Sequence, residues 1–216
     1  MASFFDKRSI PMKILTALCN LILVNICFII GCIPVFTIGA SLTATYKITI
    51  KIAAGENPSV FRDFFSCYKE NFIRSTVFWI VYCILAAFFG FEIYMVRTMM
   101  EPQYAWAQYP AYFFLFALAA SSLYSFPLIA WFDAPFKRML KNSLLLAISN
   151  LPLTIMYIVL TAALAYVIYE FTIIPLSFLV FMGISLIAWF YSLFLKRIFE
   201  KNGAVLVQKD ESGKED

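Results

Sequence analysis

Five stretches without a single Asp, Glu, Lys or Arg dominate the pattern of hydrophobic and polar positions along this chain. They are Ile14 to Tyr46, Ser75 to Phe91, Pro102 to Phe132, Asn142 to Tyr169 and Phe171 to Leu195. Most of them exceed the roughly 20 apolar residues with which an α-helix crosses about 30 Å of hydrocarbon. The pattern therefore predicts an all-α fold, a polytopic bundle of transmembrane helices.

The first stretch is too long for one span and is interrupted at Gly31, Pro34 and Gly39. Proline cannot continue the helical hydrogen-bond ladder, and it disfavours helix at the residue before it. If the chain turns at Pro34 and 38–54 crosses back, there are six spans, which is the interpretation we favour. The alternative is five spans, with 38–54 lying in the interface as an amphipathic helix. We expect six helices near Ile14 to Ile33, Ile38 to Ala54, Arg74 to Val96, Ala107 to Phe132, Ser143 to Tyr169 and Phe171 to Lys196.

The distribution of basic residues predicts the orientation. Lys and Arg cluster between 133 and 142 and again after residue 195, whereas 92–106 contains Arg97 alone. Cytoplasmic loops carry an excess of Lys and Arg, so a six-span chain has both termini in the cytoplasm. We expect one membrane domain over 1–199 and a polar cytoplasmic tail over 200–216. The net charge of +4 does not indicate nucleic acid, because no basic face is interleaved with stacking aromatic residues.

Two polar connectors on the predicted inner side combine aromatic, basic and acidic residues. In the first, aromatic residues recur at helical spacing between Phe61 and Phe72, which predicts an amphipathic helix against the inner surface. Such connectors suit either a partner protein or anionic lipid headgroups. The candidate docking residues are Phe61, Arg62, Phe65, Lys69, Glu70, Asn71, Asp133, Lys137, Arg138, Lys141 and Asn142.

Residues typical of enzymes are scarce. The chain has no histidine, which removes the usual general base and the commonest zinc ligand. Its seven glycines form neither of the common phosphate-binding spacings. The five cysteines lie in spans or on an inner connector, where disulfides are not expected. We therefore expect no catalytic residue, no metal and no cofactor.

Three charged residues are candidate intramembrane polar groups, namely Lys47, Glu92 and Glu170. A charge at the centre of the bilayer costs about 2.5–3.5 kcal/mol on insertion scales, and less if the side chain faces other helices. Lys47 would bring such a charge toward the membrane if 38–54 crosses it. The two glutamates fall at outer span ends, where they either reach water or face a shared vestibule.

Three ordered motifs resemble a known family. They are Ile33-Pro34-Val35-Phe36-Thr37-Ile38-Gly39-Ala40-Ser41, then Phe61-Arg62-Asp63-Phe64-Phe65 leading to Lys69-Glu70-Asn71-Phe72, and Phe126-Pro127-Leu128 through Phe132-Asp133 to Lys141-Asn142. Together they resemble the signatures of the YesL-like bacterial membrane proteins, a family of unknown function. The resemblance covers the chain from about Leu15 to Phe199. Lys47 departs from the apolar residue expected at that position.

The resemblance implies a multi-pass protein of a bacterial plasma membrane. YesL-like proteins are often encoded near carbohydrate uptake and degradation systems, so the resemblance also implies an association with such a system. It carries over no catalytic or ligand-binding residue. The expected function is a non-catalytic accessory component that contacts the lipid bilayer and a permease or sensor subunit of a carbohydrate importer. The alternative is a self-contained small-solute transporter or channel, which with six helices would work as a homodimer.

Overall fold

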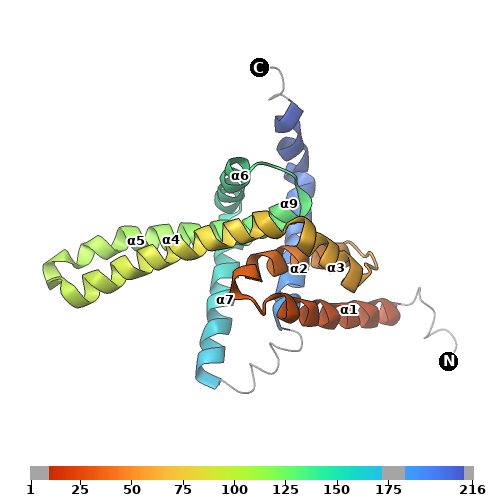
Figure 1. Cartoon of the computed structure of the whole chain (residues 1–216), viewed down its shortest axis with the longest axis horizontal. Helices are drawn as coiled ribbons and strands as arrows, with labels where there is room; N and C mark the ends of the chain where they lie inside the picture. The colour runs from red at the N-terminus through yellow and green to blue at the C-terminus, as the bar shows by residue number, and fades with distance from the viewer. Residues whose placement is uncertain (1–9, 172–182, 212–216) are drawn as a thin grey trace.

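A computed structural model describes residues 10–171 and 183–211, which are almost entirely helical (Figure 1). The helices are α1 (Ile10–Gly31), η2 (Val35–Thr37), α2 (Ile38–Ala53), α3 (Val60–Glu70), α4 (Phe72–Met99), η3 (Pro102–Ala107), α5 (Gln108–Trp131), α6 (Phe136–Ser149), α7 (Leu151–Phe171) and α9 (Ile184–Glu211). No strand occurs in these two ranges, so the all-α prediction is confirmed for them.

Several of these helices are long and apolar enough to cross a membrane. Among the described residues they are Ile14–Gly31, Phe72–Met99 and Gln108–Trp131, with a fourth span if the bent pair of α6 and α7 counts as one. With 16 residues, α2 is roughly 24 Å long at 1.5 Å per residue, which is shorter than the hydrocarbon core. The membrane-helix prediction is therefore supported in its coarse form, and the count of six spans stays a prediction.

The predicted helix from Ser143 to Tyr169 is divided in two. The chain leaves the helical conformation at Asn150, and the axes of α6 and α7 differ by 95°. Pro152 stands in the first turn of α7, where the amide that proline lacks has no helical acceptor in any case. Asn150 Nδ2 donates a hydrogen bond to the Leu146 carbonyl, which closes the end of α6. Pro152 thus starts a new helix instead of kinking a continuous one.

In the C-terminal region the helix bounds differ from those of the predicted span. The predicted span Phe171 to Lys196 begins at the last residue of α7, and 172–182 lies outside the described residues. Helix α9 continues from Ile184 to Glu211, past the predicted boundary between the membrane domain and the tail at residue 199. The helix end therefore does not coincide with the end of the apolar stretch.

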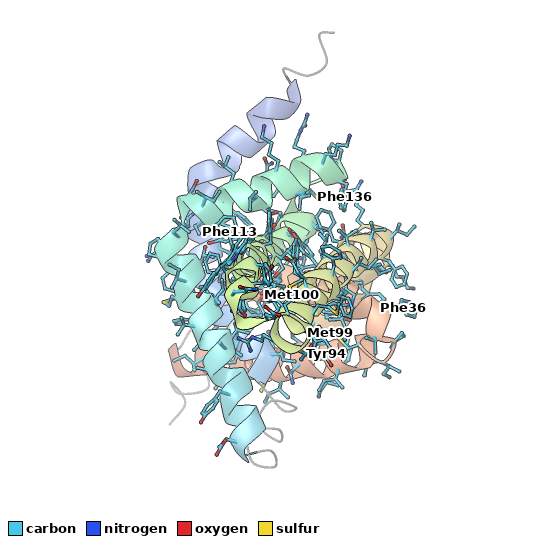
Figure 2. The ribbon with its side chains drawn as sticks, turned by 90° about the vertical axis from the view of Figure 1, so that its left-hand side faces the viewer. Phe36, Tyr94, Met99, Met100, Phe113 and Phe136 are labelled. Carbon is cyan, nitrogen blue, oxygen red and sulfur yellow. The ribbon has the colours of Figure 1, made fainter. Side chains whose placement is uncertain are left out.

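Helices α4 and α5 form a long antiparallel hairpin that extends away from the other helices (Figure 1). Figures 1 and 2 together show α7 and α9 running across this hairpin and not alongside it. Helix α2 lies at the centre, where it packs against α1, α3, α4, α5 and α9. Its small residues, such as Gly39, Ala40 and Ala44, are fully buried and allow this close approach.

Buried hydroxyl groups connect the packed helices. The Thr43 and Ser75 hydroxyls join α2 to α4, with oxygens 2.8 Å apart, and the Thr49 and Ser192 hydroxyls join α2 to α9 at the same distance. Interhelical hydrogen bonds of this kind hold helices together when the surrounding lipid is as apolar as the side chains. Helix α2 is therefore fixed in the structure by polar as well as apolar contacts.

Candidate functional site

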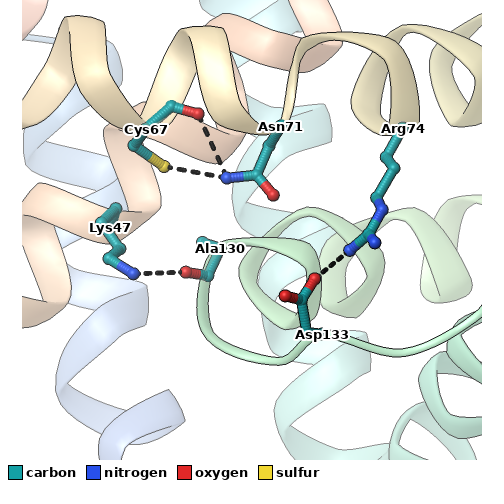
Figure 3. Close-up of polar contacts among 6 residues, drawn as sticks. All are labelled: Lys47, Cys67, Asn71, Arg74, Ala130 and Asp133. Carbon is teal, nitrogen blue, oxygen red and sulfur yellow. Dashed lines mark hydrogen bonds and ion pairs between the residues drawn. The ribbon is translucent and has the colours of Figure 1, made fainter.

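The two predicted inner connectors lie next to each other, at the end of the hairpin where α4 begins and α5 ends. Arg74, at the start of α4, donates a hydrogen bond from Nη1 to the Asp133 carboxylate, in the segment between α5 and α6 (Figure 3). Both side chains are exposed, so this ion pair adds little stability, at most about 1 kcal/mol. Its significance is geometric, because it places the start of α4, which directly follows the first connector, beside the second connector.

Helix α3 confirms the predicted amphipathic helix in the first connector. Val60, Phe64 and Cys67 are buried on its inner face. Its outer face exposes Phe61, Arg62, Phe65, Lys69 and Glu70. The spacing of aromatic residues along 61–72 thus identified the helix correctly, although it did not show which phenylalanines face outward.

The remaining candidate docking residues have different surroundings. In the second connector Asp133, Lys137 and Lys141 are exposed, whereas Arg138 and Asn142 are half-buried. Asn71 turns back on α3, because its Nδ2 donates a hydrogen bond to the Cys67 carbonyl over 3.1 Å. The structure therefore places most, but not all, of the candidate docking side chains at the surface.

Lys47 is held against the C-terminal end of α5. Its Nζ donates a hydrogen bond to the Ala130 carbonyl over 2.8 Å (Figure 3). The same Nζ lies 5.2 Å from the centre of the Trp131 ring. The last carbonyls of a helix have no partner within the helix, and they carry the negative end of its dipole. Lys51, one turn further along α2, pairs with Asp63 of α3 at 2.9 Å. Both lysines therefore bind neighbouring elements of the protein.

The two candidate glutamates occupy other parts of the molecule. Glu92 is half-buried on α4, and Glu170 is exposed near the end of α7. Neither belongs to the connector surface, and a functional role for them stays a prediction.

Cys67 lies on the buried face of α3 and is 3% exposed. Burial raises the pKa of its thiol, against the opposing effects of the Lys47 charge and a hydrogen bond from Asn71 Nδ2 to its sulfur. The thiol therefore stays protonated near neutral pH and is a poor nucleophile. All five cysteines are in the described part of the chain, and each has a free thiol. Within that part, no group of three or more His, Cys, Asp or Glu residues could hold a metal ion.

A second feature is a cavity of about 530 Å³ among α2, α4, α5, α7 and α9. We call it the inter-helix cavity. Its lining residues come from helices far apart in the sequence, among them Tyr46, Ala86, Leu118, Thr161 and Ile187. Sequence reasoning missed it, because the lining residues are of the same kinds as those of any packed helix. Small residues such as Ala86 and Ala119 are the signal that would have pointed to it.

These observations define the class of protein as an all-helical protein with several apolar helices of membrane-spanning length. A model of a family described as protein of unknown function, DUF624, matches residues 21–93, about a third of the chain. The matched segment runs from α1 through α2 and α3 into α4, and it contains the first two of the three motifs. No curated protein and no solved structure matches. The similarity is thus to an uncharacterised family, and the resemblance to YesL-like proteins stays a prediction.

Proposed function

We propose that this protein is a non-catalytic accessory component of a bacterial plasma membrane, and that it docks a permease or sensor subunit of a carbohydrate uptake system. The docking site is the connector surface, which we define as the exposed side chains of Phe61, Arg62, Phe65, Lys69, Lys137 and Lys141. The observation that carries the proposal is the ion pair between Arg74, which directly follows the first connector, and Asp133 in the second. It places the two connectors at the same end of the α4 and α5 hairpin.

The chemistry of the connector surface suits a partner loop with acidic and aromatic residues. Phe61 is 52% exposed and Phe65 37%, and the two lie one turn apart on α3. Lys137 and Lys141 have the same spacing on α6 and supply positive charge. Aromatic residues are enriched in protein interfaces relative to the rest of the protein surface.

A site-specific photocrosslinking experiment tests the docking role. A photoreactive amino acid replaces Phe65 on the connector surface in one strain and Phe113 on α5 in another; both side chains are exposed. We expect the Phe65 position to crosslink to a transport permease or sensor subunit identified by mass spectrometry, and the Phe113 position not to. If both positions capture the same proteins, or if neither captures a transport subunit, the accessory role is wrong.

The second candidate function is a self-contained small-solute transporter that works as a homodimer, and the inter-helix cavity is the observation that favours it. Purified protein in lipid vesicles would then move a solute without any other subunit. We place this candidate second, because a sugar needs hydrogen-bonding groups along its path and the cavity contains no charged side chain in the described part of the chain. Flux of labelled sugars into such vesicles would make the transporter the preferred function and the accessory role the second.

A further inference from the structure

We propose that the inter-helix cavity is a binding site for the hydrocarbon chain of a membrane lipid. Its volume of about 530 Å³ lies within the range of roughly 300–1,000 Å³ that is typical of ligand pockets. Most of its wall is formed by aliphatic and aromatic side chains from five helices. This inference is independent of the docking role of the connector surface.

Four of the polar side chains that line the cavity are hydrogen-bonded to other parts of the protein. The Ser122 hydroxyl donates to the Ala119 carbonyl over 2.8 Å, and the Thr161 hydroxyl donates to the Tyr157 carbonyl over 2.7 Å. Similarly, Trp79 Nε1 donates to the Val35 carbonyl, and the Tyr82 hydroxyl bonds to Ser121 and Ser125. These groups have their partners already and offer little to a polar ligand.

Tyr157 and Tyr191 present their rings to the cavity. Each residue is 1% exposed, and their ring centres are 4.1 Å apart in an edge-to-face contact. Their hydroxyl oxygens are enclosed by protein atoms, so a ligand in the cavity has no access to them. A sugar or an ion in this cavity would leave its own polar groups unpaired, which is costly in an apolar environment. An apolar chain loses no hydrogen bonds on entering it.

The position of the cavity points to lipid as the source of that chain. Two of its walls, α4 and α5, are helices of membrane-spanning length and composition. The outer surface of the same hairpin exposes large apolar side chains, including Phe88 and Phe113, the second of which is labelled in Figure 2. Hydrocarbon chains therefore surround the helices that form the cavity, and burying one in the cavity matches apolar surface with apolar surface.

Photolabelling in vesicles tests the proposal. The whole protein is reconstituted with phosphatidylcholine that carries a diazirine in its acyl chain, irradiated and digested, and the labelled residues are mapped by mass spectrometry. We expect labels on the lining residues Leu118 and Ile187, as well as on the outer surface of the hairpin. The Ala86→Phe variant, which fills the cavity from α4, should lower labelling of Leu118 and Ile187 at least about tenfold, since its ring takes the place of several methylene groups of the lipid chain.

The neighbouring variant Ala87→Phe is the matched control, because Ala87 is also exposed on α4 but is not among the residues that line the cavity. Labelling of Leu118 and Ile187 should be unchanged in this variant. If Ala86→Phe does not give a monodisperse protein, Ala119→Phe fills the cavity from α5. Equal labelling of Leu118 and Ile187 in folded cavity and control variants, or labels on the outer hairpin surface alone, would overturn the proposal. Competition with excess palmitic acid separates a free fatty acid from a phospholipid chain as the occupant.

Discussion

At the scale of single residues, Gly39 has no room for a side chain. A Cβ built on it would fall on the Ser75 carbonyl oxygen and 2.7 Å from Trp79 Cβ, both on α4. Because a backbone carbonyl cannot move without shifting its helix, Gly39→Ala should force α2 and α4 apart. We expect the free energy of unfolding to fall by about 1–3 kcal/mol, the usual cost of overpacking. Thermal unfolding of the purified protein in detergent measures it.

Gly90→Ala is the control for Gly39→Ala, since Gly90 is also in a helix but has open space around its Cα. The added methyl group should leave stability unchanged or raise it by up to about 1 kcal/mol, because alanine favours helix more than glycine does. An equal loss in both variants would contradict the packing argument. From the sequence, Gly39 was interpreted as an interruption of an apolar stretch, and its role in helix contact became visible only with α4 in place.

At the scale of helices, Lys47 bonds α2 to the end of α5. Replacing Lys47 should therefore lower the free energy of unfolding more than replacing Lys51 does. Lys47→Met leaves the Ala130 carbonyl without its donor in a partly buried place, at a cost of about 1–3 kcal/mol. Lys51→Met breaks an ion pair whose side chains are each 27% exposed, which should cost at most about 1 kcal/mol. Chemical denaturation of both variants compares these costs, and a larger loss for Lys51→Met would show that Lys47 does not fasten the helices.

The helices themselves were largely predictable from the sequence. The predicted bounds of α2, α4 and α5 agree with the structure to within a few residues, because charged residues and glycine or proline mark their ends locally. The division at Asn150 was not predicted, since a proline in an apolar stretch can either kink one helix or begin another. Which of the two occurs depends on the packing of α6 against α5, a contact between residues distant in sequence.

At the scale of the whole molecule, the sequence indicated a membrane protein but not the arrangement of its helices. The apolar stretches predicted a bundle of spans without fixing their crossing angles, and α7 and α9 run across the hairpin of α4 and α5 in the structure (Figures 1 and 2). Hydropathy reports how long and how apolar a helix is, and it contains no information about crossing angles. For the same reason the connector surface was predictable from local residue patterns, while the inter-helix cavity was not.

The hairpin of α4 and α5 should be the part of the molecule that anchors it in the membrane. Phe88 lies near the middle of α4 and is 63% exposed, whereas Phe61 on α3 is 52% exposed in a polar connector. If the hairpin crosses the bilayer, Phe88→Arg places a charge among lipid chains at a cost of about 2.5–3.5 kcal/mol, and Phe61→Arg places the same charge near water. We therefore expect Phe88→Arg to lower the fraction of protein that resists carbonate extraction, and Phe61→Arg to leave it unchanged. If both variants resist carbonate extraction equally, the exposed face of α4 does not contact lipid, and Phe88 must pack against protein instead.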